Sequence, residues 1–277
     1  MTSKSTNLIK FYALILFIWI FGLIILPHLG LLYSSFHSDE VFTLSNYIEF
    51  FKHKIYINTL TYTFFNGILV TFLAFIFAVP LAFFLVKMIK KKTANFLIFI
   101  LLIPLGVGEL IVVYGWMISL NDNGIVNYIL NLFGINIKIL NTPFSMILGF
   151  VYMSIIFMLL PIMQSLENLD NSYIEAALDL GANKFDIFTK IIIPFTLPGI
   201  VSGSIMVFSL VIGDFLIPNL LGGKSALWFT EIIYDDFLMT MNWSEGSAFG
   251  FILLLTTLLV IWIFLKLTKQ EFTKVIK

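Results

Sequence analysis

Six long apolar runs limit what this chain can fold into. Each is close to the ~20 residues that a helix needs to cross the hydrocarbon core of a bilayer. Within that core a backbone must satisfy its own hydrogen bonds, so helices are the expected form. The six runs lie at 11–33, 59–86, 95–119, 143–166, 195–217 and 247–266. The sequence therefore predicts an all-α membrane protein with six transmembrane helices.

The composition excludes several classes of function. Of the 277 residues, 60% are hydrophobic and 12% are charged, which is too little charge for a water-soluble surface. The absence of cysteine excludes disulfides, thiol catalysis and cysteine-ligated metals. The three histidines show no ligand spacing, so we expect no metal site and no cofactor. A formal net charge of zero removes any case for nucleic-acid binding.

The distribution of lysine predicts the orientation of the spans. Cytoplasmic loops of membrane proteins carry an excess of basic residues. With both termini inside, the inner segments hold twelve lysines and the outer loops hold four. We therefore expect both termini, and the loop between the fourth and fifth runs, in the cytoplasm of a bacterial cell with this chain in its inner membrane.

That loop, residues 170–194, is a hydrophilic segment between two apolar runs. Its first half has helix signals, because Ser172 can cap a helix with Glu175 three residues later, the capping-box spacing. Gly181 is expected to end this helix, since a left-handed residue closes the turn without a Cβ penalty.

The second half of the loop predicts another short helix. Asn183 can cap it, with Asp186 in the first turn and Lys190 in the last, where each charge suits the helix dipole. Pro194 is then expected to stop or redirect the chain.

Two carboxylates stand within or close to the apolar runs. A charge at the bilayer centre costs about 2.5–3.5 kcal/mol on insertion scales unless it faces water or a partner. Glu109 lies inside the third run and Asp214 near the outer end of the fifth. Each either caps or hydrogen-bonds a neighbouring helix, or lines a pathway for cations; the sequence leaves both interpretations open.

Small residues mark one packing face and one false motif. Gly199 and Gly203 form a small-xxx-small pair in the fifth run, which predicts close helix packing. Residues 222–225 look like the end of a phosphate-binding loop, but Pro218 stands where the motif needs glycine. We therefore expect no enzyme activity from this chain and an energy source on another subunit.

The hydrophilic loop resembles the EAA loop of ATP-binding cassette (ABC) importer permeases. In that family Glu-Ala-Ala is followed after three residues by glycine, and after nine more by Ile-x-Leu-Pro. Here Glu175-Ala176-Ala177 precedes Gly181, and Ile191-Ile192-Ile193-Pro194 follows, with isoleucine for leucine as the one departure. The resemblance implies that Glu175, Ala176, Ala177, Gly181 and Pro194 couple this chain to a cytoplasmic ATPase.

The resemblance extends over nearly the whole chain to the spermidine/putrescine type of these permeases. The stretches that carry it are 42–47, 79–85, 114–117, 123–127 and 213–218 with 221–223. It implies a single permease domain over 1–277, with a core at about 59–268 and the coupling loop at 170–194. It also implies an ABC ATPase dimer, a second permease subunit, an extracytoplasmic substrate-binding protein, and surrounding membrane lipid as partners.

Other functions stay open. The same family includes importers for ferric iron, sulfate and phosphonates. An ion-coupled secondary transporter would use Glu109 or Asp214 for coupling and should show repeats and broken midplane helices, of which the sequence gives no sign. A purely structural membrane protein would need no buried carboxylates.

Overall fold

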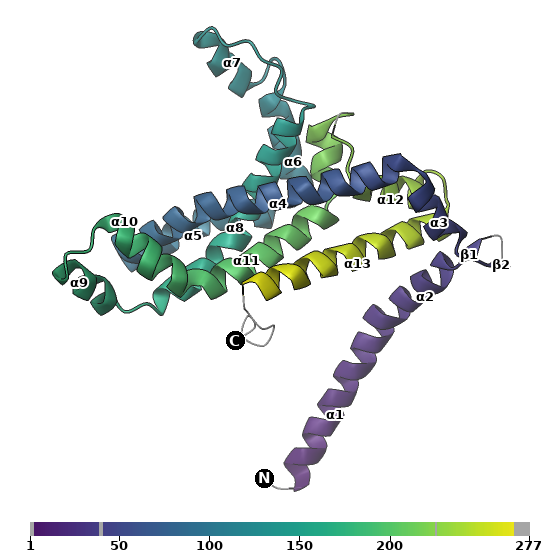
Figure 1. Ribbon diagram of the computed structural model, residues 1–277, viewed down its shortest axis with the longest axis horizontal. Helices are drawn as coiled ribbons and strands as arrows, with labels where there is room; N and C mark the ends of the chain where they lie inside the picture. The colour runs from purple at the N-terminus through teal and green to yellow at the C-terminus, as the bar shows by residue number, and fades with distance from the viewer. Residues whose placement is uncertain (1–2, 39–40, 225, 269–277) are drawn as a thin grey trace. The chain divides into compact units, whose positions relative to one another are not determined.

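The computed structural model describes residues 3–38, 41–224 and 226–268 and is almost entirely helical (Figure 1). It divides into two compact units. The first contains the chain up to Asn58 together with Ile232–Leu255, and the second contains Thr59–Glu231 together with the chain from Thr256 onward. Several helices run from one unit into the other.

The first unit begins with the first membrane span. A continuous helical stretch combines α1 (Ser3–Ile20), a π-helical turn η1 (Phe21–Ile25) and α2 (Leu26–Ser35). The apolar part, Lys10–Ser35, confirms the predicted run at 11–33. A two-stranded antiparallel hairpin of β1 (His37–Ser38) and β2 (Val41–Phe42) then leads to α3 (Ser45–Lys52).

Charged side chains gather in the first unit where α3 ends and α12 (Phe229–Leu238) precedes α13 (Trp243–Leu267). The ring of His53 lies 2.7 Å from a Glu49 carboxylate oxygen. Asp236 is half-buried, and burial together with the charges of Glu245 and Asp235 raises the pKa of its carboxyl to about 7. This carboxyl therefore keeps its proton to much higher pH than an exposed one.

The second unit holds the four middle spans and the part of the last span from Thr256 onward. Its elements are α4 (Lys54–Phe83), η2 (Phe84–Met88), α5 (Lys91–Val107), α6 (Glu109–Leu120), α7 (Ile125–Leu132), α8 (Pro143–Glu167), α9 (Asn171–Asp179), α10 (Lys184–Ile187), η3 (Phe188–Ile192), α11 (Ile193–Gly213) and η4 (Pro218–Gly222). Over the described residues, five helices are long and apolar enough to cross a membrane, and the bent pair of α5 with α6 makes a sixth. The prediction of six spans is confirmed with that pair counted as one.

The third predicted run, 95–119, is not one straight helix. α5 and α6 meet at a bend of 98°. The residue between them is Gly108, whose φ of +94° lies where only glycine is comfortable. A glycine with this backbone conformation ends α5 and begins α6. The structure thus has a broken helix that the sequence analysis did not predict.

The second helix of the hydrophilic loop does not stop at Pro194, which corrects the sequence prediction. α10, η3 and α11 form one helical stretch, Lys184–Gly213. Proline normally clashes with the carbonyl four residues earlier. Here that carbonyl belongs to Lys190, inside the π-helical turn η3, and the wider turn accommodates the ring. The fifth span therefore begins in the loop itself.

α8 and α11 make the most extensive helix contact among the described elements, and they run side by side in Figure 1. The predicted small-residue face is at this contact. A Cβ on Gly199 would lie 2.4 Å from the carbonyl oxygen of Pro161, and one on Gly203 would lie 2.9 Å from the sulfur of Met158. Only hydrogen at these two positions lets the backbones approach so closely, as expected for helix pairs in lipid.

This close approach predicts that Gly199→Ala destabilises the protein. The added methyl group overlaps a backbone oxygen, so α8 and α11 must separate, at a cost of roughly 1–3 kcal/mol for overpacking. Gly250→Ala is the matched control, because a Cβ there meets nothing within 4 Å. Thermal unfolding of the purified variants should show a lower midpoint for Gly199→Ala only; equal midpoints would contradict this packing.

The environment of Asp236 predicts a pH-dependent stability. An unfolded aspartate loses its proton near pH 3.9, whereas the folded one retains it to about pH 7. The folded state then binds more protons between these values, so stability falls as pH rises from about 4 to about 7. Each pH unit changes the free energy of unfolding by at most about 1.4 kcal/mol, and solvent screening reduces that.

Asp236→Asn should remove this slope from thermal unfolding midpoints measured at several pH values between 4 and 8. Asp122→Asn is the control, because Asp122 is exposed and belongs to the second unit, whereas the charge of Asp235 itself acts on Asp236. The same pH profile for wild type and Asp236→Asn would refute the assigned environment.

Candidate functional site

The helix break at Gly108 positions the first of the two predicted carboxylates. Glu109 is the first residue of α6 and an acidic residue in its first turn. Its charge is therefore stabilised by the amino end of the helix dipole. Its side chain is exposed in the isolated chain.

Asp214 directly follows α11 and is fixed by its neighbours. Its carboxylate Oδ1 accepts hydrogen bonds from the backbone N–H of Leu216 at 2.7 Å and of Ile217 at 3.4 Å. The Thr230 hydroxyl donates to its main-chain carbonyl at 2.6 Å. One carboxylate oxygen of Asp214 thus caps the turn that follows, which bears out the capping interpretation for this residue.

The structure also brings the two carboxylates together. Glu109 and Asp214 line the same cavity of about 680 Å³. The two carboxyl groups lie close enough for the charge of Glu109 to act on Asp214. Asp214 therefore both caps a turn and faces a cavity, so the two interpretations of the sequence do not exclude each other here.

The rest of the cavity wall is mostly apolar and comes from four helices. The other lining residues are Leu105, Leu110, Phe150, Met153, Ser154, Phe157, Ser209, Leu210, Val211, Gly213, Phe215, Leu216 and Ile217. Carboxylates that accept hydrogen bonds amid apolar walls suit a cation with N–H donors. Among the described residues no group of three His, Cys, Asp or Glu side chains has the arrangement of a metal site.

The first helix of the hydrophilic loop begins differently from the prediction. Asp170, not Ser172, is the capping residue, and its Oδ1 accepts from the backbone N–H of Ser172 at 2.9 Å. This hydrogen bond lowers the pKa of the Asp170 carboxyl, with a smaller contribution from the charge of Lys87. The Ser172 and Glu175 capping box is therefore wrong. Ser172 and Asp170 are both residue types that cap helices, but Asp170 lies two residues earlier and its carboxylate accepts the hydrogen bond.

The end of this helix and the start of the next follow the prediction. Gly181 has a φ of +79° and ends α9, with the N–H of Ala182 donating to the carbonyl of Ala177 at 2.9 Å. Asn183 caps α10 by accepting from the N–H of Asp186 at 2.9 Å. The loop is therefore a pair of short helices joined by a left-handed glycine.

One face of α9 packs inward and the other is exposed. Ala177 is half-buried against the core, whereas Glu175 and Ala176 are exposed. Large apolar side chains are exposed on the same loop, with Leu180 at 88% and Phe185 at 74%. Tyr173 and Leu178 are also exposed. Exposed apolar groups on a hydrophilic segment mark an interaction surface.

Lys87 also holds the loop, and the sequence analysis used it only for its charge. Its ammonium donates to the main-chain carbonyl of Leu169 at 2.5 Å and to the side-chain oxygen of Asn171 at 3.0 Å. The C-terminal end of the second span is thereby tied to the start of α9. No local pattern could have revealed a contact between residues more than 80 positions apart.

Comparison with known proteins assigns the family. Residues 55–270 match the model of the binding-protein-dependent transport system inner membrane component. The chain is 33% identical to the spermidine/putrescine transport system permease protein PotB of Haemophilus influenzae, over 94% of each protein. It is 34% identical to PotB of Escherichia coli K12, over 88% of this chain and 93% of that one.

A solved structure supports the same fold. The crystal structure of a bacterial alginate ABC transporter, in complex with an alginate pentasaccharide-bound periplasmic protein, contains a chain with a TM-score of 0.81. It is 17% identical and covers 97% of both chains, so the likeness concerns the fold alone. From the match over most of its length, this chain belongs to the family of binding-protein-dependent transport system inner membrane components.

Proposed function

We propose that this chain is a permease subunit of an ATP-driven ABC importer and that its cargo is a polyamine such as spermidine or putrescine. The single observation that carries the cargo is the pair of carboxylates, Glu109 and Asp214, in one cavity. The names of the relatives support the same cargo.

The electrostatics of the cavity favour a cation with several charges. Two carboxylates close together repel each other, and a bound cation relieves that repulsion. Because the cation faces both carboxylates, its attraction offsets the desolvation cost of the two groups together. A polyamine also has methylene segments that can lie against apolar walls such as Phe150 and Phe157. Sulfate and phosphonate, the anionic alternatives, would be repelled.

The two carboxylates have different roles in this proposal. Asp214 is fixed by two backbone N–H groups, so it offers a site of constant position. Glu109 begins a separate helix after a glycine break, so its distance to Asp214 changes whenever the helices move. A cation held between them would be released when the carboxylates separate. This suits transport, because a site that binds its cargo too tightly does not release it.

Removing either charge should slow uptake. Glu109→Gln and Asp214→Asn keep the side-chain volume and lose the charge, so we expect slower spermidine uptake by the reconstituted importer, by roughly tenfold if each charge contributes about 1.4 kcal/mol. Assembly and basal ATPase activity should stay unchanged. Asp122→Asn, at an exposed position before α7, is the control.

The same assay separates the rival functions. The break at Gly108 is a specific observation in favour of a secondary transporter, since such proteins use broken helices at their ion sites. Uptake that persists when the membrane potential is dissipated with ATP retained supports the importer. Uptake lost under these conditions would reject it, and transport of ferric iron or an anion in place of polyamines would reject only the cargo.

We further propose that the hydrophilic loop couples this chain to a cytoplasmic ATPase dimer. The spacing of Glu175, Ala176, Ala177, Gly181 and Pro194 and the exposed Leu180 and Phe185 support this role. A second permease completes the path, an extracytoplasmic binding protein delivers the cargo, and ATP-driven closure alternates access. The lysine distribution supports an inner-membrane location with both termini in the cytoplasm.

A chain without cysteine allows a direct test of this arrangement. A single cysteine in Leu180→Cys should react with a membrane-impermeant maleimide only from the cytoplasmic side, and should form a crosslink to the ATPase in the assembled importer. Phe133→Cys, at an exposed position after α7, should react only from outside. Labelling of the Leu180→Cys variant from outside would overturn the coupling role and the orientation together.

A further inference from the structure

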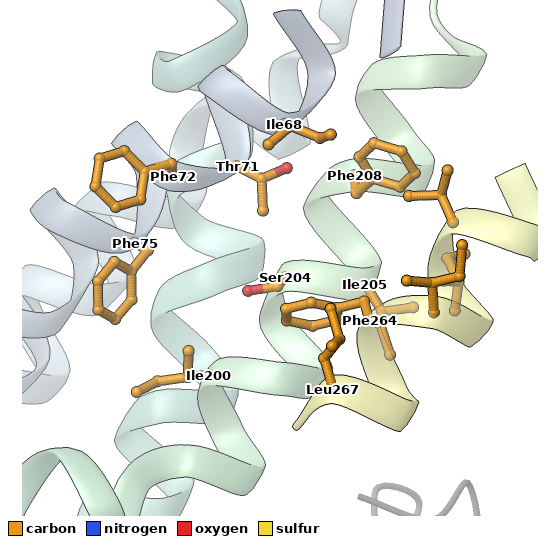
Figure 2. Close-up of a pocket in the computed structure, with 13 residues that line it drawn as sticks. Ile68, Thr71, Phe72, Phe75, Ile200, Ser204, Ile205, Phe208, Phe264 and Leu267 are labelled. Carbon is orange, nitrogen blue, oxygen red and sulfur yellow. The ribbon is translucent and has the colours of Figure 1, made fainter. Parts of the chain in front are cut away.

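A second cavity lies between α4, α11 and the C-terminal half of α13, apart from the two carboxylates. Its volume is about 430 Å³. Figure 2 shows the side chains around it, with Phe72 and Phe75 from α4, Ile200 from α11 and Phe264 from α13. All three helices belong to candidate membrane spans.

The chemistry of the wall excludes a polar occupant. Thr71 and Ser204 carry the only side-chain hydroxyls among the lining residues. Thr71 Oγ1 donates to the carbonyl of Gly67 at 2.8 Å, and Ser204 Oγ donates to the sulfur of Met158 at 4.0 Å. Water requires two to four polar partners in a cavity, and the two hydroxyls already donate their hydrogens within the protein. The lining therefore favours an apolar occupant.

The rim of the cavity opens toward the bilayer. Ile68 and Phe72 on α4 and Leu267 on α13 are exposed, at 54%, 55% and 76%. These side chains lie on candidate membrane-spanning helices, so lipid reaches them wherever no partner subunit covers them. Because Thr71 and Ser204 are small, the three helices leave a space there that a lipid chain can enter.

The C-terminal end of α13 supplies positive charge beside this opening. Lys266 precedes the lining residue Leu267, and its ammonium lies 5.1 Å from the ring centre of Trp262. Residues 266–277 contain four lysines and one glutamate. Basic clusters at the end of a membrane helix attract anionic lipid head groups.

From these observations we propose that the cavity is a binding site for one acyl chain of an anionic phospholipid. The chain inserts between α4, α11 and α13, and the head group lies at Lys266. The site differs from ordinary lipid contact because three helices enclose the chain and a lysine selects the head group. The proposal is independent of the cargo.

Photocrosslinking tests the site in the complete importer, reconstituted in nanodiscs of phosphatidylethanolamine with a phosphatidylglycerol that carries a diazirine on its acyl chain. Mass spectrometry should find the label concentrated at 68–75, 200–208 and 260–267. Labelling there should exceed several-fold that of Ile76 and Leu255, which are exposed but lie outside the cavity. Unlabelled phosphatidylglycerol should compete for it.

Two pairs of variants separate the tail from the head group. Ile205→Trp on α11 fills the cavity and should abolish the concentrated label, whereas Ile76→Trp, at an exposed position of α4 outside the cavity, should not. Thr71→Leu fills the space from α4 with a smaller side chain and serves if the tryptophan variant fails to assemble. Lys266→Gln should reduce the preference for phosphatidylglycerol over phosphatidylethanolamine several-fold, whereas Lys92→Gln should not.

Three results would overturn the proposal. They are labelling spread evenly over lipid-facing residues, labelling that survives both filling variants in assembled importer, and crosslinks that show a helix of the second permease in the cavity.

Discussion

The close backbone approach of α8 and α11 is the interaction on which the second unit depends. In lipid, helices gain little from burying apolar surface, because the surrounding chains are equally apolar. The strength of helix association then depends on how closely the two backbones approach. Gly199 and Gly203 allow an approach that any larger side chain would prevent. α8 lines the carboxylate cavity and ends at the hydrophilic loop, and α11 leaves that loop and ends at Asp214. The same pair therefore positions both candidate sites.

Much of the fold follows from hydrophobicity alone, because a bilayer imposes a length on each apolar run. The ends of the loop helices also follow from local chemistry where one residue dominates, as Gly181 and Asn183 do. The physical cost of a charge in hydrocarbon was enough to single out Glu109 and Asp214. The sequence could not show that these two carboxylates lie close together, since they belong to segments far apart along the chain.

Two features that the sequence did not predict correctly, at Pro194 and Gly108, share a physical cause. Pro194 and Gly108 are both residues that break helices, and the outcome at each depends on the turn around it. At Pro194 the π-helical turn before the ring lets the helix continue, whereas at Gly108 the positive φ bends it by 98°. Asp170 displaced Ser172 because a carboxylate is a stronger acceptor of the same N–H. The bonds of Lys87 needed tertiary structure.

The unbroken helix Lys184–Gly213 has a mechanical meaning. Its 30 residues extend over about 45 Å at 1.5 Å per residue. Gly199 falls midway along it, at the close contact with α8, so a rigid tilt of the helix about this contact would move its two ends in opposite directions. A tilt of ~5° moves each end by about 2 Å in opposite directions, given arms of about 22 Å. Under such a tilt, a displacement of the loop would shift Asp214 relative to Glu109 without any relay of side chains between them.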